Sequence, residues 1–207
     1  MKRDILFNLF LIFSLGFLPG CGKIIDWGKK HVDQGQDLDP DLKLAKSFIR
    51  SARIYDQFEL VGGFDALLLA DPVRIAYANF YALKHGKDKA QKRVFLRRQL
   101  EENNYFIAFY VLSLKTMRLG ENDSKWTLFL KVGDKSYAPV EIRIEDLDPE
   151  YRDIFGKKFS KFKDSYLVFF NAKDVEGNYI FSEEEKGKIS LVFRGLKKET
   201  ELSWDIG

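Results

Sequence analysis

The stretch YFIAFYVLSL, residues 105–114, limits the possible folds of this chain more than any other segment. It is apolar at both odd and even positions, whereas a strand with one face in water alternates apolar and polar residues. A strand that is apolar on both faces is covered on both faces. We therefore expect residues 105–114 to form a central strand, with a second sheet on one side and a helical hairpin on the other.

The helical hairpin is expected immediately before this strand, over about residues 71–103. Its first helix starts with Asp71 as N-cap and Pro72 in the first helical position, and it ends at His85-Gly86. The apolar stripe of this helix comprises Ile75, Ala76, Phe80 and Leu83. The second helix covers about residues 88–103, and its expected inward side chains are Val94, Phe95, Leu96 and Leu100.

The segment before the hairpin predicts a strand with one buried face. Residues 49–60 alternate with a period of two, and the expected inward set is Ala52, Ile54, Phe58 and Leu60. Gly62-Gly63 is expected to end this strand. The run FDALLL, residues 64–69, is compatible with the start of either a strand or a helix.

The second half of the chain predicts antiparallel β-structure. Residues 125–144 indicate one hairpin that turns at Gly133-Asp134, with Pro139 on an edge strand or at a bulge. Its inward set is Trp126, Leu128, Leu130, Ala138, Val140, Ile142 and Ile144. A short helical or irregular crossover at 148–156 leads to strands at 165–170, 188–193 and 201–206. The expected fold is mostly β with inserted helices: an immunoglobulin-like or transthyretin-like antiparallel β-sandwich with a helical hairpin.

The first residues have the order of a secretory signal. Met1-Lys2-Arg3 is basic, the run from Ile5 to Leu18 is apolar, and Pro19-Gly20 follows. As a helix, the apolar run spans only about 21 Å at ~1.5 Å per residue, and a bilayer core requires roughly 20 residues. A cleaved signal peptide is therefore favoured over an uncleaved anchor or a buried helix.

Leu18 at position −3 and the only cysteine, Cys21, at +1 resemble the lipobox of bacterial lipoproteins, although Pro19 departs from the usual residue at −2. The resemblance covers residues 1–22 and implies that residues 1–20 are removed, that diacylglycerol is attached to the sulfur of Cys21, and that the freed amine is acylated. Two or more acyl chains give stable membrane attachment, whereas one chain does not. An ordinary signal peptide is the alternative interpretation.

The same resemblance suggests a location and a division of the chain. Gly22, in place of aspartate, implies export to the outer membrane, with the protein facing the periplasm. The polar residues after the lipidated cysteine predict a flexible tether over 21–41, followed by a single domain over 42–207. Because the lipid occupies the only thiol, no disulfide is expected.

The composition limits the class of partner. The chain has 19 Phe and 9 Tyr, which indicates a packed core, and its formal net charge is only +3, which argues against nucleic acid as a partner. We expect the membrane, through the lipid anchor, and another envelope protein to be the partners. No cofactor is expected besides the covalent diacylglycerol and N-acyl lipid on Cys21.

Charge is most uneven over residues 84–98, which contain seven Lys or Arg and one Asp. On a helix, these residues form a candidate basic contact face that comprises Lys89, Lys92, Arg93, Arg97 and Arg98. Three interpretations remain open: a solvated face that pairs with Glu101 and Glu102, contact with anionic lipid headgroups, or contact with a protein partner.

Acidic residues supply two weaker candidates. Asp174, Glu176 and Glu183 match the third, fifth and twelfth positions of an EF-hand loop, but Ala172 at the first position has no ligand, so a solvated loop and a weak calcium site both remain open. A hydrolase would require a cleft where several carboxylates converge, among Asp146, Asp148, Glu150 and Asp153. The two histidines, His31 in the tether and His85 at a helix end, suggest no metal site, and no catalytic residue is assigned.

Aromatic residues in predicted turns supply a last candidate, a ligand platform formed by Tyr137, Tyr151, Tyr179 and Phe181. Taken together, the sequence predicts a lipid-anchored envelope protein that acts as a non-catalytic interaction or scaffold module. The alternative is a small-ligand or glycan-binding lipoprotein, with its site on these aromatics or in a pocket between the hairpin and the sheet.

Overall fold

The computed structural model describes residues 40–181 and 187–206, which contain nine strands and four α-helices. The elements are α3 (Pro40–Ser47), β1 (Ile49–Asp56), β2 (Glu59–Leu68), α4 (Asp71–Lys84), α5 (Lys89–Asn103), β3 (Phe106–Leu114), β4 (Trp126–Val132), β5 (Lys135–Tyr137), β6 (Glu141–Ile144), α6 (Pro149–Phe155), β7 (Lys163–Asn171), β8 (Gly187–Gly195) and β9 (Glu199–Ile206). The signal at 1–20, Cys21, the tether up to residue 39 and Glu183 lie outside the described residues.

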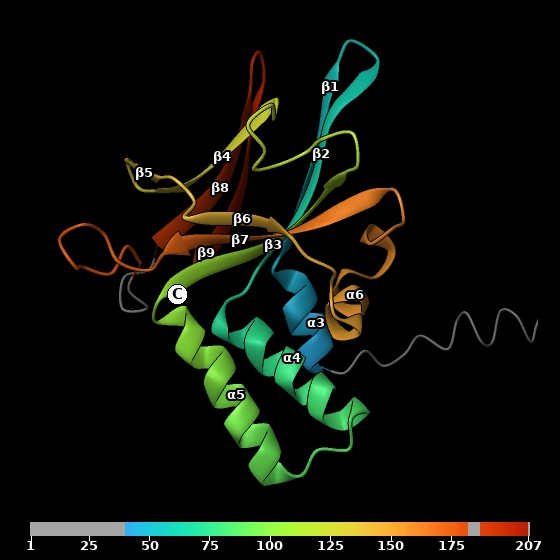
Figure 1. Cartoon of the computed structure of the whole chain (residues 1–207), viewed down its shortest axis with the longest axis vertical. Coiled ribbons are helices and arrows are strands. Elements are labelled where there is room, and N and C mark those ends of the chain that lie inside the picture. The colour runs from blue at the N-terminus through green and yellow to red at the C-terminus, as the bar shows by residue number, and fades with distance from the viewer. Residues whose placement is uncertain (1–39, 182–186, 207) are drawn as a thin grey trace, which may run out of the picture. The chain divides into compact units, whose positions relative to one another are not determined.

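Two antiparallel sheets pack face to face (Figure 1). One sheet has the strand order β1-β2-β3-β7-β6, and the other has the order β5-β4-β8-β9. The side chains between them form one hydrophobic cluster, in which the ring of Phe64 stacks on that of Phe193 with centroids 4.0 Å apart. Trp204 closes the same cluster against Phe109 and donates a hydrogen bond to the carbonyl of Phe48. The predicted mostly β, sandwich-like architecture with inserted helices is confirmed.

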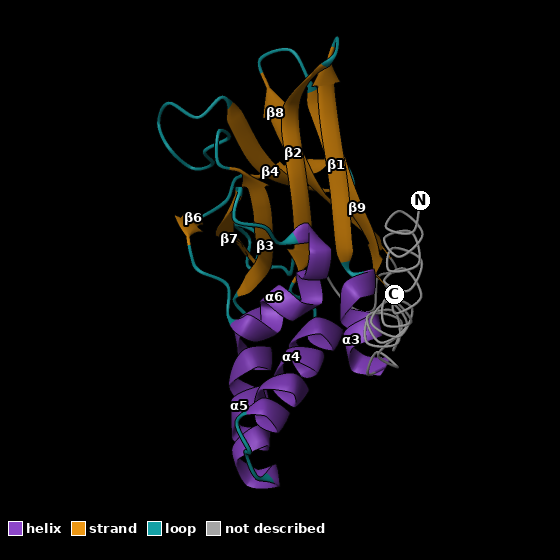
Figure 2. Ribbon diagram, turned by 90° about the vertical axis from the view of Figure 1, so that its right-hand side faces the viewer, coloured by secondary structure: helices purple, strands orange, loops and turns teal. Residues whose placement is uncertain are grey.

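β3 is the middle strand of the five-stranded sheet, as the sequence predicted. Phe109 and Val111 face the other sheet, and Ala108, Tyr110 and Leu112 face a second cluster beneath the helices. That second cluster is covered by α3, α4 and α6 rather than by both helices of the hairpin. α5 instead packs on α4, and the hairpin projects beyond the end of the sheets (Figure 2).

The hairpin boundaries are confirmed to within one residue, but the inward faces are partly wrong. Ala70, not Asp71, is the N-cap of α4, and Gly86 has the expected left-handed φ of 59° after the helix. Asp88 caps α5 in a capping box with Gln91. Exposed apolar side chains occur where the sequence predicted inward ones, namely Ile75, Leu83 and Val94. The buried face of α4 is formed instead by Val73, Arg74, Ala76, Tyr77, Ala78 and Ala82.

The predicted single strand over 49–60 is wrong, because the chain reverses at Gln57-Phe58 and forms the β1–β2 hairpin. Phe58 is therefore fully exposed at the turn, while Ile54 faces the core as expected. Gly62-Gly63 does not end a strand but lies inside β2. At Gly62 the chain needs glycine, since a Cβ there would lie 2.8 Å from Ile54 Cδ1 and 2.9 Å from Trp126. The run 64–69 continues as strand β2 up to Leu68.

The predicted hairpin over 125–144 divides between the two sheets. β5 pairs with β4 over only three residues, and β6 then pairs with β7 in the other sheet. Pro139 lies between β5 and β6, where its missing N–H does not interrupt a ladder. Ala138 and Val140, in the connection between β5 and β6, and Ile144, at the end of edge strand β6, are exposed, contrary to the inward pattern expected for them. α3 was not predicted, because its residues were assigned to the end of the tether and the start of the domain.

Candidate functional site

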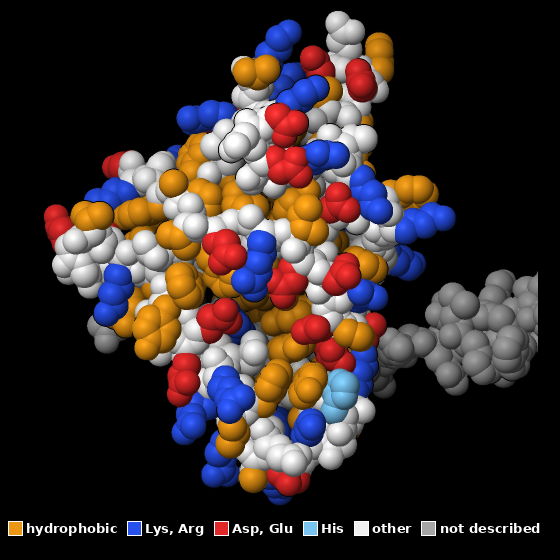
Figure 3. All heavy atoms as spheres, viewed as in Figure 1, with side chains coloured by type: hydrophobic (Ala, Val, Ile, Leu, Met, Phe, Trp, Pro, Cys, Tyr) orange, Lys and Arg blue, Asp and Glu red, His pale blue; other side chains and the backbone are white. Residues whose placement is uncertain are grey.

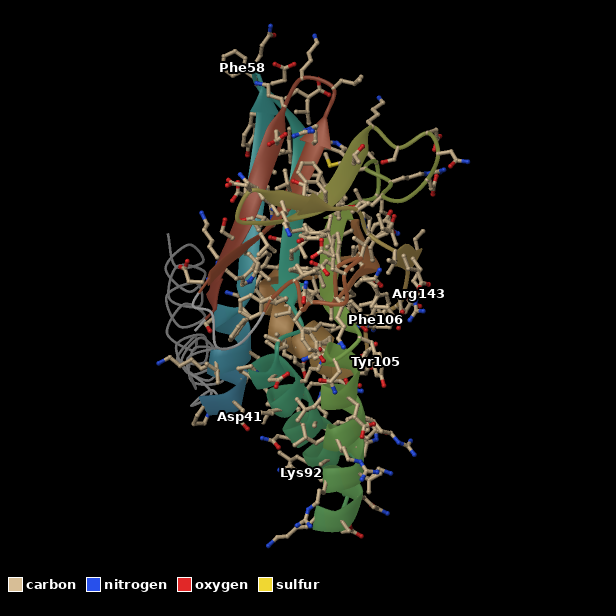
Figure 4. All side chains as sticks on the ribbon, turned by 90° about the vertical axis from the view of Figure 1, so that its left-hand side faces the viewer. Asp41, Phe58, Lys92, Tyr105, Phe106 and Arg143 are labelled. Atoms are coloured by element: carbon tan, nitrogen blue, oxygen red, sulfur yellow. The ribbon has the colours of Figure 1, made fainter. Side chains whose placement is uncertain are left out.

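A groove of about 770 Å³ lies where the helical hairpin meets the sheets. It lies at the two junctions between strands and hairpin helices: β2 leads into α4, and α5 leads into β3. These junctions come together because β2 and β3 are antiparallel neighbours. The lining includes Phe48, Leu69, Asp71, Pro72, Leu100, Asn103, Phe106, Ile107, Tyr179, Phe181 and Ile189. Figure 4 labels Tyr105 and Phe106 at the junction of α5 with β3.

A polar frame centred on Arg74 holds the two helices together behind this groove. Arg74 is only 1% exposed, and its Nη1 donates to Glu102 Oε2 at 2.6 Å and to Gln99 Oε1 at 3.1 Å. Its Nε donates to Asn103 Oδ1 at 2.6 Å, and Asn103 Nδ2 in turn donates to Asp71 Oδ1 at 2.6 Å. The groove residues Asp71 and Asn103 are therefore fixed by each other and by a buried cation.

Aromatic side chains form the second support of the hairpin. Phe95 of α5 stacks on Tyr81 of α4 at 4.5 Å, and Tyr77 stacks on Tyr151 of α6 at 4.2 Å. The Tyr77 hydroxyl donates to Asp148 at 2.7 Å. Burial raises the pKa of Tyr77, and this hydrogen bond raises it further, so the phenol stays neutral and acts as a donor. These stacked aromatic side chains hold α5 against α4, and α4 against α6.

The structure brings only half of the predicted aromatic platform together. Tyr179 and Phe181 line the groove, and the ammonium of Lys173 lies 4.6 Å from the centre of the Tyr179 ring. Tyr151 is buried beneath the helices, contrary to the exposed position expected for it. Tyr137 belongs to β5 and packs against the core between the sheets. The groove also corresponds to the pocket that was expected between hairpin and sheet for a ligand-binding protein.

The carboxylates of residues 146–153 do not converge on the groove, whose lining includes none of them. Asp148 accepts from Tyr77, and Asp153 pairs with Lys84 at 2.6 Å. Glu150 is buried 3.7 Å from His85 Nε2 and 3.8 Å from Lys84 Nζ. These contacts attach α6 to the end of α4, so three of the four hydrolase candidates, Asp148, Glu150 and Asp153, have structural partners.

The acidic loop after β7 is a tight turn. Asp174 Oδ1 accepts hydrogen bonds from the backbone of Glu176 and Asn178, and Gly177 has a φ of 85°. The Asp174 carboxylate therefore stabilises the turn itself. The third residue of the calcium prediction, Glu183, lies outside the described residues. Within the described ranges, no group of three or more His, Cys, Asp or Glu side chains is placed to hold a metal ion.

A buried charge cluster around Asp65 escaped sequence reasoning. Asp65 is completely buried in β2, and its carboxylate pairs with Arg53 at 2.9 Å and with Lys163 at 2.5 Å. Lys158 approaches to 3.8 Å and also donates to Ser51. Burial raises the pKa of Asp65, but hydrogen bonds from Lys163, Ser51 and Arg53 together lower it below its usual value. The sequence signal for this cluster, which was not used, is the single acidic residue within the apolar run FDALLL.

Most of the basic contact face predicted on α5 is exposed to solvent in the structure. Arg97 pairs with Glu101 at 3.4 Å, and Glu102 turns inward to Arg74. Lys89, Arg93 and Arg98 are exposed, Lys92 is half-buried, and none of the four forms an ion pair with another described residue. Lys and Arg side chains gather over the hairpin in the space-filling view (Figure 3).

Compared with protein-family models, curated proteins and solved structures, the chain shows no significant match. Within residues 40–181 and 187–206, the helices are too short or too polar to cross a bilayer. The geometry described above gives two candidate sites: the groove at the base of the hairpin, and the basic contact face farther along the same hairpin.

Proposed function

We propose that the protein is a lipid-anchored, non-catalytic binding module of the bacterial cell envelope. In this proposal, diacylglycerol on Cys21 attaches the chain to the outer membrane, the tether follows, and the folded domain faces the periplasm and binds another envelope protein. Two packed antiparallel sheets are compatible with either an immunoglobulin-like or a transthyretin-like sandwich, and the proposal includes that class of fold.

The groove is the observation that supports a binding role. Its walls are largely apolar and aromatic, and its half-buried polar residues Asp71 and Asn103 are hydrogen-bonded to each other rather than presented to a substrate. Such a surface suits an apolar segment of a partner, because burial of that segment supplies the affinity. The rigid frame around Arg74 keeps the groove in shape before binding, which reduces the entropy lost on association.

A second candidate function is the binding of a small ligand or glycan. The groove volume of about 770 Å³ lies in the range of small-molecule sites, ~300–1,000 Å³. Tyr179 is exposed beside Phe181 at its rim, as a stacking platform for a sugar or an apolar ring requires.

Site-specific photocrosslinking tests the binding role. With p-benzoylphenylalanine in place of Tyr179, irradiation of cells is expected to give one discrete adduct, because this side chain lies in the groove. The matched control is the same replacement of Phe58, an exposed aromatic residue at the opposite end of the domain (Figure 4), which is expected to give none. An adduct of protein size supports the leading function, and a gain of small-molecule size supports the second. No adduct from Tyr179, or the same products from both positions, would contradict both.

A further inference from the structure

We propose that the end of the helical hairpin docks on an anionic lipid bilayer and thereby sets the orientation of the anchored domain. The docking surface, called the basic face below, comprises the cations Lys87, Lys89, Arg93 and Arg98 and the apolar residues Leu83 and Val94. This inference takes the membrane location from the proposed function, but it concerns a surface outside the groove and does not depend on what the groove binds.

The charge of the hairpin end supports an anionic partner. Between residues 84 and 98 the only carboxylate is Asp88, which accepts the backbone N–H of Gln91 as the cap of α5. Of the seven cations there, Lys84 pairs with Asp153 and Arg97 with Glu101, while the other five form no ion pair within the described part of the chain. Each Lys or Arg near an anionic membrane contributes about 1 kcal/mol to binding; three of them correspond to roughly 100-fold in affinity.

The apolar side chains among these cations favour a bilayer over a purely polar partner. Leu83 at the end of α4 is 77% exposed, and Val94, between Arg93 and Arg97 in sequence on α5, is 46% exposed. Neither has a place in the interface between the two helices, which Phe95, Tyr77 and Tyr81 fill. Cations interspersed with exposed aliphatic groups are the pattern of surfaces that lie in the headgroup region.

The position of the face also suits a planar partner. The hairpin projects beyond the sheets, so its outer side can meet a flat surface before the sandwich does (Figure 2). The tether from Cys21 to α3 has fewer than twenty residues, which at full extension reach about 60 Å at ~3.3 Å each. Anchored this closely, the face meets the bilayer at a high effective concentration, so modest affinity suffices.

Vesicle binding tests this inference without the lipid anchor. The protein used is residues 22–207, the whole chain after the predicted lipidation site, which contains no cysteine. Ala90, exposed on the basic face, is changed to cysteine and labelled with a nitrobenzoxadiazole dye. We expect its fluorescence to rise with vesicles of phosphatidylglycerol and phosphatidylcholine in equal parts, and not with phosphatidylcholine alone. The rise should weaken as salt concentration increases.

Two triple variants identify the residues responsible. Lys89→Gln, Arg93→Gln and Arg98→Gln together are expected to weaken vesicle binding on the order of 100-fold. Lys125→Gln, Lys135→Gln and Lys197→Gln remove the same charge from exposed positions on the sandwich and are expected to have little effect. Equal loss in both variants, or no binding of the parent protein to anionic vesicles, would overturn the inference. That failure would leave the groove and the anchor untouched, because photocrosslinking and the mass of the N-terminus test those separately.

Discussion

Replacement of Asp65 by asparagine is expected to lower the free energy of unfolding by about 3–5 kcal/mol, because it leaves the largely buried ammonium of Lys163 without its counter-charge. Lys163 has a side chain only 11% exposed, and its ammonium lies 2.5 Å from the Asp65 carboxylate. Arg53 makes two hydrogen bonds to the same carboxylate, so the change affects two strands and the start of β7 together. Urea denaturation of both proteins at neutral pH measures the difference.

The matched control for Asp65 is an exposed ion pair of similar geometry. Arg194 and Glu199 lie 2.5 Å apart, and their side chains are 60% and 49% exposed. Glu199→Gln should therefore cost less than about 1 kcal/mol. Asp65→Asn combined with Lys163→Met should recover part of the loss, because an apolar side chain needs no counter-charge. A cost for Asp65→Asn no greater than that for Glu199→Gln would show that the cluster does not stabilise the fold.

The same cluster predicts how stability depends on pH. Because the folded-state pKa of Asp65 lies below its ordinary value of 3.8, the ionised group contributes its full stabilisation above pH 3.8. That contribution is lost as the pH falls from 3.8 through the folded-state pKa. The difference in stability between the parent protein and Asp65→Asn should accordingly be constant near neutral pH and shrink below pH 3.8.

Glu102→Gln is the second change with a large expected effect, a loss of about 2–4 kcal/mol. It removes the counter-charge of Arg74, which is buried and has one nitrogen, Nη2, without a hydrogen-bond partner among the described residues. The Glu102 side chain is itself 37% exposed, so the cost arises mainly from the arginine left behind. Thermal unfolding measures the loss. The substitution should also increase the rate of amide hydrogen exchange more along α5 than along β3.

Glu101 supplies a control in the same helix. Its carboxylate lies 3.4 Å from Arg97 in an exposed pair of i and i+4 residues, a pair worth about 0.3–0.5 kcal/mol. Glu101→Gln should therefore leave the exchange of α5 nearly unchanged. Similar losses for Glu101→Gln and Glu102→Gln would mean that Arg74 does not organise the hairpin.

The parts of the fold that local chemistry determines could be predicted from the sequence. The two-sided apolar pattern of 105–114 correctly predicted the central strand, and Asp88 and Gly86 correctly marked helix ends. The turn at Gln57-Phe58 was missed, because Gln57 takes a φ of 53° without the glycine or asparagine that usually marks such a position. The glycines at 62 and 63 were misinterpreted as the end of a strand. Gly62 is instead required to admit Ile54 and Trp126, which the sequence alone does not place beside it.

The candidate site was only partly predictable for the same reason. The exposure of Lys89, Arg93 and Arg98 depends on helical spacing alone and could be predicted, whereas the outward position of Val94 depends on how α5 rests on α4. The role of these cations as a contact face stays a prediction. The groove joins residues as distant in sequence as Leu69, Asn103 and Tyr179, so no local pattern specifies it. Asp65 and Arg74 had a detectable signal, since a charged residue within an apolar pattern requires a partner. The identity of that partner depended on the tertiary structure.

The mass of the N-terminus tests the central claim, that this domain acts at a membrane surface, more directly than any other measurement. The chain purified from membranes in its native host is expected to begin at Cys21 and to carry diacylglycerol on the sulfur and an acyl group on the amine. Cys21→Ser should correspondingly release the protein from carbonate-washed membranes. A native chain that retains residues 1–20, or that has a free thiol at Cys21, would contradict the account.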